Sequence, residues 1–130
     1  MTRPLRVLVV DDCPDMRATL RILLRLWGHE VREAGDGPAA LGLATTFKPD
    51  TVLLNIGLPA LDGYEVARRL RQLPGLGHVL LIAVTGYGSA QDLAACRAAG
   101  FDHHLLKPFD PTDLERLLGP PANGIASPPS

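Results

Sequence analysis

The chain has 130 residues, 46% of them hydrophobic, and a formal net charge of −1 at pH 7. This length fits one domain, and the near-zero charge is unlike that of proteins that bind nucleic acid non-specifically. No apolar run approaches the roughly 20 residues that cross a bilayer, and the N-terminus lacks the apolar segment of a secretory signal. Two cysteines far apart in the sequence, Cys13 and Cys96, fit a reducing cytoplasm and form no metal-ligand spacing.

Five apolar segments alternate along the chain with amphipathic ones, and this pattern predicts a parallel sheet covered by helices on both faces. The predicted strands are residues 5–10, 29–34, 51–55, 79–84 and 102–106. The first, third and fourth are almost continuously apolar, as expected of strands that are buried on both faces. The second is more polar and suits an edge of the sheet.

Residues that favour helix ends stand between these strands. Pro14 and Pro38 suit the first turn of a helix, where the missing N–H of proline costs nothing. Ser89, followed by an acid three residues later, predicts that the fourth helix begins with a capping box. Gly28 and Gly100 stand where the C-terminal caps of helices are expected.

Polar side chains follow four of the predicted strands at the point where each strand ends. Asp11 and Asp12 follow the first strand, Asn55 ends the third, Thr85 follows the fourth and Lys107 follows the fifth. Because open α/β sheets carry their functional groups at the carboxyl ends of the strands, these side chains are expected in one crevice. Two adjacent carboxylates repel each other unless a positive charge compensates them, and Mg²⁺ suits this role because it binds a few protein oxygens.

This arrangement resembles the receiver domain of bacterial two-component response regulators, over about residues 5–118. The resemblance implies an α/β fold of the (βα)5 flavodoxin-like type, a doubly wound parallel sheet with strand order 2-1-3-4-5. We therefore expect residues 1–118 to form the receiver domain. Residues 119–130 are rich in proline, glycine and serine and are predicted to be a flexible tail or linker. In the family, the position that matches Asn55 is the aspartate that accepts a phosphoryl group from a histidine kinase.

The resemblance also implies a magnesium site. In the family, the cation is held by the residues that match Asp12 and Asn55 and by the backbone carbonyl that matches Gly57, and the residue that matches Asp11 assists through water. An amide at position 55 removes one negative charge that would face the cation. A full charge contact at about 4 Å is worth roughly 4 kcal/mol at an effective dielectric near 20, so Asn55 is expected to weaken Mg²⁺ binding.

Three further positions have roles that the resemblance implies. In the family, the threonine that matches Thr85 moves to bond the phosphoryl group, and the lysine that matches Lys107 pairs with it. The Lys107–Pro108 bond is expected to be cis, as it usually is in the family. His104 stands where the family often carries a tyrosine or phenylalanine that acts as a switch. An ordinary surface histidine beside His103 is an equally weighted interpretation of the same position.

An amide is a poor nucleophile because its nitrogen lone pair is delocalised, so Asn55 is not expected to accept phosphate. The leading hypothesis is a receiver domain of a two-component phosphorelay that stays unphosphorylated in this form and acts through protein contact. Its expected partners are a histidine kinase or histidine phosphotransfer protein, and a protein that docks on the face of the fourth helix, fifth strand and fifth helix. The amide is either natural or a laboratory substitution, and the otherwise intact pocket favours a recent or deliberate change.

Two other functions fit part of the sequence. One is a natural, phosphate-independent pseudo-receiver that acts as an interaction module. Arg17, Arg21 and Arg25 would form a basic stripe that meets an acidic partner, although such stripes are more often solvated. The other is an enzyme such as an aspartate-nucleophile phosphatase, which needs an acid, one spacer and another acid after the first strand. Residues 11–15 do not supply this arrangement, so we expect no enzyme, and neither nucleic acid nor membrane as a partner.

Overall fold

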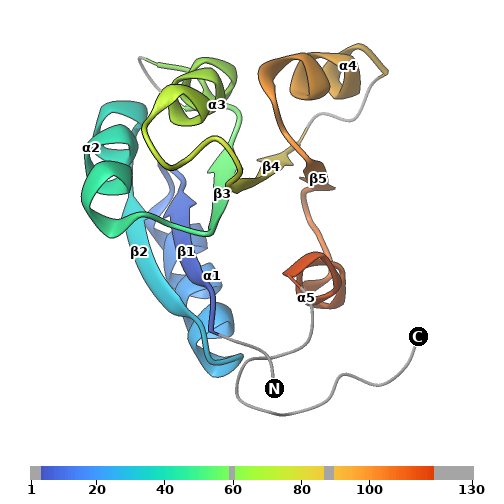
Figure 1. Cartoon of the computed structure of the whole chain (residues 1–130). Coiled ribbons are helices and arrows are strands. Elements are labelled where there is room, and N and C mark those ends of the chain that lie inside the picture. The colour runs from blue at the N-terminus through green and yellow to red at the C-terminus, as the bar shows by residue number, and fades with distance from the viewer. Residues whose placement is uncertain (1–3, 59–60, 87–89, 119–130) are drawn as a thin grey trace.

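The computed structural model describes residues 4–58, 61–86 and 90–118. Within these ranges strands and helices alternate along the chain (Figure 1): β1 (Arg6–Val10), α1 (Pro14–Leu26), β2 (Glu30–Ala34), α2 (Gly37–Phe47), β3 (Thr51–Asn55), α3 (Gly63–Gln72), β4 (Leu80–Thr85), α4 (Ala90–Ala99), β5 (His103–Leu106) and α5 (Pro111–Leu118). The strands form one parallel sheet in the order β2-β1-β3-β4-β5. The predicted (βα)5 fold and strand order are therefore confirmed, and each strand begins and ends within one residue of its prediction.

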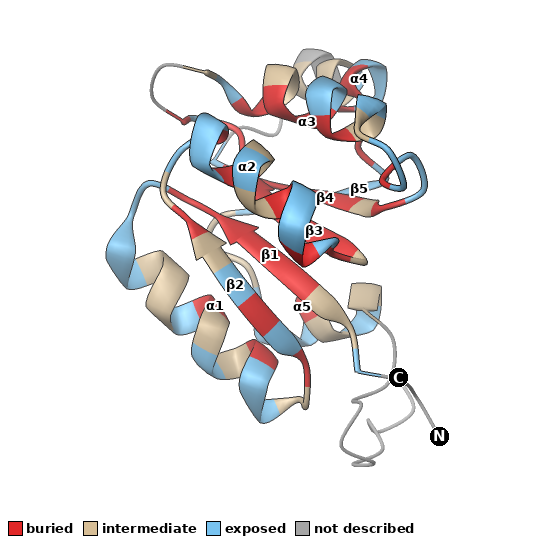
Figure 2. Cartoon of the chain, turned by 60° about the vertical axis from the view of Figure 1, so that its left-hand side comes forward, coloured by how far each residue is buried: buried red, intermediate tan, exposed pale blue. Residues whose placement is uncertain are grey.

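Each face of the sheet has its own apolar core because side chains along a strand point alternately to its two faces. On β1, Leu8 and Val10 belong to the core that α2, α3 and α4 cover, whereas Val7 and Val9 belong to the core under α1 and α5. The helices lie in these two layers in Figure 1, and Figure 2 shows β1 almost entirely buried between them. The outer strand β2 has exposed residues between its buried ones, as expected of an edge.

The described helix ends agree with their sequence signals. Pro14 is the first residue of α1, and Pro38 stands in the first turn of α2. Gly28 and Gly100 follow α1 and α4 with φ angles of 91° and 101°. Glycine adopts this left-handed conformation without the steric cost that a Cβ atom brings, so both helices end where predicted.

Two sequence predictions fall outside the described residues. These are the capping role of Ser89 at the start of the fourth helix and the flexible tail at residues 119–130, and both stay predictions. Across the three described ranges, no helix has the length and apolar character that crossing a membrane requires.

Gly63, the first residue of α3, allows this helix to begin directly against the end of β3. A Cβ atom at position 63 would lie 2.7 Å from Ile56 Cα and 2.8 Å from the backbone oxygen of Asn55, which is closer than side chains pack. The Gly63 N–H donates to the Ile56 carbonyl at 3.0 Å, and the Asp62 carboxylate caps the helix by accepting from the Glu65 N–H at 2.9 Å. These contacts hold the loop that follows Asn55.

The substitution Gly63→Ala is expected to lower the free energy of unfolding by roughly 1–3 kcal/mol, because the backbone atoms opposite the added methyl cannot move aside. Gly42→Ala is the matched control. Gly42 is exposed on α2, and nothing lies within 4 Å of a Cβ atom added there, so alanine should stabilise that helix by about 0.5–1 kcal/mol. Urea denaturation measures both effects, and equal small effects at the two positions would contradict the close-approach argument.

His29 is a buried imidazole, 6% exposed, just before β2. The Leu5 N–H donates to His29 Nδ1 at 3.1 Å, and the Glu30 N–H donates to the Leu5 carbonyl at 2.9 Å. An accepting Nδ1 belongs to a neutral ring in this contact, and burial lowers the pKa of His29 below its usual value. The neutral ring is therefore part of the link between the starts of β1 and β2.

Because the pKa of His29 is lower in the folded chain than in the unfolded chain, its contribution to stability is complete above the unfolded value of 6.5. The contribution is lost as the pH falls through the lower folded pKa. We expect the free energy of unfolding to decrease from about pH 7.5 to about pH 5.5. In His29→Asn, whose Oδ1 accepts the same bond but takes no proton, the decrease should be smaller. Urea denaturation at both pH values tests this, and an equal decrease in both proteins refutes it.

Candidate functional site

The carboxyl end of the sheet brings together side chains from separate strands. Asp11 and Asp12 follow β1, Asn55 ends β3, Thr85 ends β4 and Lys107 follows β5. Lys107 Nζ lies 3.5 Å from Asp11 Oδ2 and 3.5 Å from Asn55 Oδ1. Asn55 Nδ2 donates to Asp12 Oδ1 at 3.2 Å. Four of the predicted site residues therefore meet through their side chains.

Asp11 is the most buried acid of this site, with 2% of its surface exposed. Its Oδ1 accepts from the Cys13 N–H at 2.9 Å, and its Oδ2 faces the Lys107 ammonium. Its backbone is held as well, because its N–H donates to the Ala34 carbonyl at 3.1 Å and its carbonyl accepts from Arg17 at 2.6 Å. A buried carboxylate needs such hydrogen bonds and a countercharge, so the position of Asp11 is well determined.

Asn55 lies between the Asp12 carboxylate and the Lys107 ammonium, and its amide makes a hydrogen bond with each. The amide N–H of Nδ2 faces the Asp12 carboxylate, and the amide oxygen faces the Lys107 ammonium. This is the orientation that satisfies both neighbours, since an amide has a donor on one side and an acceptor on the other. Asn55 is 9% exposed, whereas Asp12 is exposed at the mouth of the site.

Lys107 is positioned through its own backbone as well as through its charge. Its N–H donates to the Thr85 carbonyl at 2.8 Å, which continues the pairing of β5 with β4 beyond Leu106. The Lys107–Pro108 bond is cis, as expected. The Lys107 side chain is 29% exposed, and Thr85 is buried at 3%. The structure therefore brings the backbones of Thr85 and Lys107 together at the same end of the sheet.

The oxygens at this end are suited to a hard cation. Carboxylate and amide oxygens are ligands of the kind that Mg²⁺ uses together with water, and Asp11, Asp12 and Asn55 bring such oxygens to this end of the sheet. Gly57, two residues beyond Asn55, is exposed, and nothing lies within 4 Å of where its Cβ would be. Within the described part of the chain, no three acidic, histidine or cysteine side chains group closely enough to bind a metal. A cation here would therefore depend on Asn55 or on backbone oxygens.

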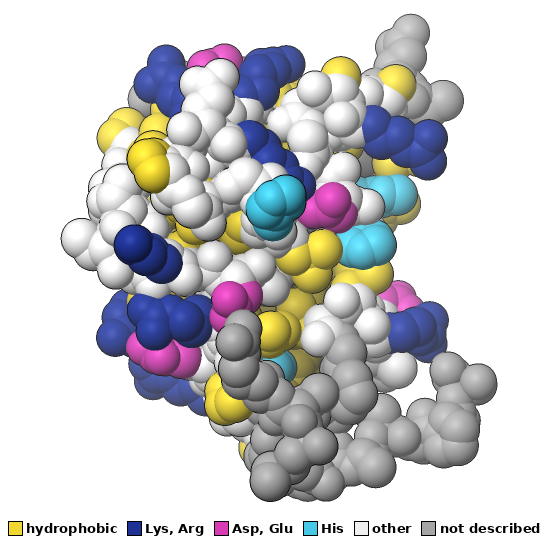
Figure 3. Space-filling view, viewed as in Figure 1, with side chains coloured by type: hydrophobic (Ala, Val, Ile, Leu, Met, Phe, Trp, Pro, Cys, Tyr) yellow, Lys and Arg dark blue, Asp and Glu magenta, His cyan; other side chains and the backbone are white. Residues whose placement is uncertain are grey.

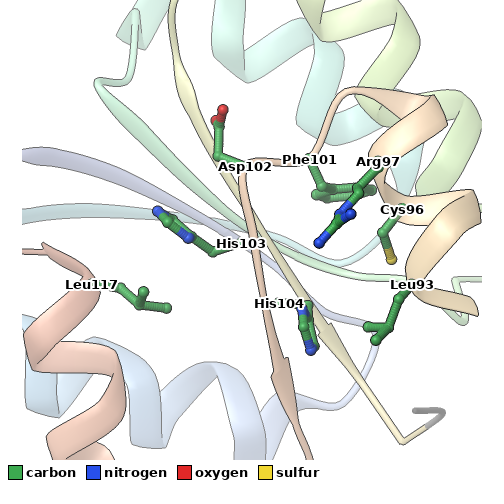
Figure 4. A pocket seen from close by; sticks show the side chains of 8 residues that line it. All are labelled: Leu93, Cys96, Arg97, Phe101, Asp102, His103, His104 and Leu117. Atoms are coloured by element: carbon green, nitrogen blue, oxygen red, sulfur yellow. The ribbon is translucent and has the colours of Figure 1, made fainter. Parts of the chain in front are cut away.

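His104 lies on β5, on the surface formed by α4, β5 and α5. Figure 4 shows His103 and His104 on opposite sides of β5, with His104 near Leu93 of α4 and His103 on the side of Leu117 of α5. Both histidines are exposed. They line a hollow of about 260 Å³, whose lining is Leu93, Cys96, Arg97, Phe101, Asp102, His103, His104 and Leu117. The position of His104 is open to a partner, and its role as a switch stays a prediction.

The basic stripe on α1 has an internal partner that sequence reasoning missed. Glu33 on β2 pairs with Arg17 at 3.5 Å and accepts a hydrogen bond from Arg21. The spacing of the arginines predicted that they share a helix face, but the acid that this face meets depends on how α1 packs on β2. Only the fold reveals this pairing. On the face shown in Figure 3, arginine and lysine side chains form separate groups near acidic ones and no continuous basic surface.

Comparisons with known proteins agree with this architecture. The sequence profile of the response regulator receiver domain matches residues 7–118. The chain is 43% identical over 104 residues to the transcriptional regulatory protein PrrA of Mycobacterium tuberculosis, an overlap that covers 80% of this chain and 44% of that regulator. Its structure is similar to that of the chemotaxis protein CheY4 of Vibrio cholerae, with a TM-score of 0.85 and 28% identity over 89% of this chain and 97% of that one.

A receiver domain with a bound metal is also similar. The receiver domain of a sensor histidine kinase from Pseudomonas aeruginosa matches with a TM-score of 0.81 and 32% identity, covering 89% of this chain and 95% of that one, and it has a magnesium ion coordinated in its active-site cleft. The chain spans about half the length of several DNA-binding and transcriptional regulators that it matches. The family match over residues 7–118 and the shared fold establish that this chain belongs to the response regulator receiver domain family.

Proposed function

We propose that this chain is the receiver domain of a two-component phosphorelay and that, in this form, it takes no phosphoryl group because Asn55 stands at the acceptor position. The observation that carries the proposal is the place of the amide, at the end of β3 between Asp12 and Lys107. An acceptor must attack phosphorus with an oxygen lone pair. The amide oxygen is a weak nucleophile, so it supports the geometry of the pocket without supporting the transfer.

The same amide contacts support weakened binding of Mg²⁺. The residues that would hold the cation are Asp11, Asp12 and Asn55, together with the backbone carbonyl of Gly57. A cation beside Asp12 meets the N–H of Asn55 Nδ2, which lies 3.2 Å from Asp12 Oδ1, instead of an oxygen lone pair. Offering the oxygen requires the amide to turn over, and both of its hydrogen bonds are then lost. When bound, Mg²⁺ would neutralise the acid pair and draw phosphoryl oxygens into the pocket.

The domain is proposed to signal by binding a protein through the surface of α4, β5 and α5. A histidine kinase or histidine phosphotransfer protein is proposed as the partner that binds at the pocket. Hollows of about 260 and 520 Å³ on this surface share His104 and Leu117. Leu106 on β5 is 44% exposed. Apolar and titratable groups around a hollow suit a protein partner, and His104 would be the switch residue there.

A phosphate-independent pseudo-receiver is the second candidate, and one observation favours it. Asp12 and Lys107 already have neighbours of suitable polarity in the Asn55 amide, so the pocket is balanced without a cation. A domain that signals without phosphate would need no cation to stabilise these charged side chains. The two candidates differ in whether the rest of the pocket still supports phosphoryl transfer once an aspartate is present.

Incubation with Mg²⁺ and acetyl phosphate, followed by intact mass measurement, is expected to add one phosphoryl group to Asn55→Asp and none to the unsubstituted chain. Aspartate supplies the nucleophile that asparagine lacks, while Lys107 and Thr85 already lie at the same end of the sheet. Asn55→Ala is the control, since it removes the amide without supplying an acceptor. Uptake by the unsubstituted chain would contradict the proposed role of Asn55. No uptake by Asn55→Asp would favour the pseudo-receiver.

In the absence of metal, Asn55→Asp is expected to unfold more easily than the unsubstituted chain, by roughly 1–2 kcal/mol, because a second carboxylate would face Asp12 at the exposed mouth of the site. Adding Mg²⁺ should remove most of this difference. Urea denaturation in EDTA and in Mg²⁺ measures both. Asn55→Ala is the control, because it removes the hydrogen bonds of the amide without adding a charge. Equal destabilisation of the alanine and aspartate variants without metal would refute the repulsion argument.

A further inference from the structure

Arg17 on α1 reaches the backbone at the end of β1. Its Nη1 donates to the carbonyl oxygen of Asp11 at 2.6 Å, and its Nε lies 3.5 Å from Glu33 Oε1 on β2. The Arg17 and Glu33 side chains are 22% and 24% exposed, so water screens this ion pair only in part. One guanidinium therefore links α1, β1 and β2 directly beside the acid pair.

Two neighbours shape the space that the Arg17 guanidinium occupies. A Cβ atom at Gly35, just after β2, would lie 3.2 Å from Arg17 Nη1, so the missing side chain leaves room for this contact. Arg21, one turn further along α1, donates to Glu33 Oε2 and holds the other oxygen of the same carboxylate. Figure 2 shows α1 running beside β2, which is the packing that makes these contacts possible.

The carbonyl that Arg17 binds belongs to the peptide between Asp11 and Asp12. The carboxylate of Asp11 has its own contacts, with the Cys13 N–H and with Lys107. Asp12 is exposed, and its carboxylate meets Asn55. Because the peptide is planar, holding its oxygen also sets the direction in which Asp12 leaves the strand. Arg17 thus acts on the relative placement of the two acids without touching either carboxylate.

We propose that Arg17 is a positioning residue for the acid pair: with Glu33 behind it, it fixes the Asp11–Asp12 peptide so that both carboxylates converge on one divalent cation. This inference rests on the proposed function of the pocket as a cation and phosphoryl site. Outer contacts that orient metal ligands commonly change metal affinity by about 10- to 100-fold when they are lost.

Charge and geometry predict opposite effects of removing Arg17. If only its charge acted on the pocket, Arg17→Ala would tighten divalent cation binding, since a positive charge near the acids would be gone. If Arg17 positions the peptide, the same change weakens binding. Arg17→Lys keeps the charge but replaces a planar group with several donors by a single ammonium, which cannot serve Asp11 and Glu33 in the same way. Positioning therefore predicts weaker binding in both variants.

The experiment is a Mg²⁺ titration of the full chain followed by backbone amide NMR, made in the unsubstituted background and repeated with Asn55→Asp. Arg17→Ala and Arg17→Lys should each weaken Mg²⁺ binding by about tenfold or more. Arg21→Ala is the matched control. It removes a positive charge and a hydrogen bond to Glu33, and it leaves the Arg17 hydrogen bond to the Asp11 carbonyl in place. Its affinity should stay within about twofold of its parent. Unchanged or tighter binding in Arg17→Ala, or equal weakening in Arg21→Ala, overturns the proposal.

A readout without metal separates this inference from the function of the pocket. The N–H of Asp12 belongs to the peptide that Arg17 holds, so its amide resonance should shift in both Arg17 variants and stay in place in Arg21→Ala. Melting temperatures confirm that each variant is folded. If neither the unsubstituted chain nor Asn55→Asp binds Mg²⁺, the proposed function fails, while the Asp12 resonance still decides whether Arg17 positions the peptide. No shift at Asp12 overturns the positioning role.

Discussion

The burial of the Asp11 charge is the constraint on which the arrangement of the pocket depends. A carboxylate with 2% exposure is stable only with a countercharge and hydrogen bonds around it. The countercharge is Lys107, which follows β5, whereas Asp11 follows β1, and β3 and β4 lie between these strands. The ion pair therefore joins the segments that follow β1 and β5 across the two strands between them, and it depends on the pairing of β1, β3, β4 and β5.

The Asn55 amide connects the Asp12 carboxylate with the ion pair of Lys107 and Asp11. The sequence of contacts runs from the Asp12 carboxylate to the amide N–H, from the amide oxygen to the Lys107 ammonium, and from that ammonium to Asp11. A carboxylate at position 55 offers acceptors alone and would need a cation beside Asp12. Under the proposed function, the amide supplies neither a nucleophile nor a charge that needs a cation, so a disabled receiver and a pseudo-receiver would have the same contacts at rest.

Much of the fold and part of the site could be predicted from the sequence because the signals are local. β1, β3 and β4 are short and mostly apolar runs, and Asp11, Asp12, Asn55 and Lys107 stand immediately at strand ends, so parallel topology alone gathers them. The direction of the Asn55 amide could not be predicted, since it depends on neighbours that follow β1 and β5.

The contacts that support the site were also beyond sequence reasoning. The partnership of Arg17 with Glu33 depends on the rotation of α1 over β2, which no spacing along the chain reveals. The need for glycine at position 63 depends on how closely α3 approaches β3. The apolar pattern indicates which face of a helix is buried, but not which backbone atom it meets.

Arginine side chains donate hydrogen bonds to backbone carbonyls in this chain, and the shape of the guanidinium group explains why arginine suits these contacts. Arg71 on α3 binds the carbonyl of Gly100 and the carboxylate of Asp102 together, at 2.7 and 2.9 Å. Arg17 likewise meets a carbonyl and a carboxylate at once. A planar guanidinium with several donors can serve two acceptors in fixed directions, whereas an ammonium is a compact charge on a flexible stem. In this chain Lys107 faces the side-chain oxygens of Asp11 and Asn55. Arg17 instead binds a backbone carbonyl at the carboxyl end of β1, and Arg71 binds backbone carbonyls that precede β4 and β5.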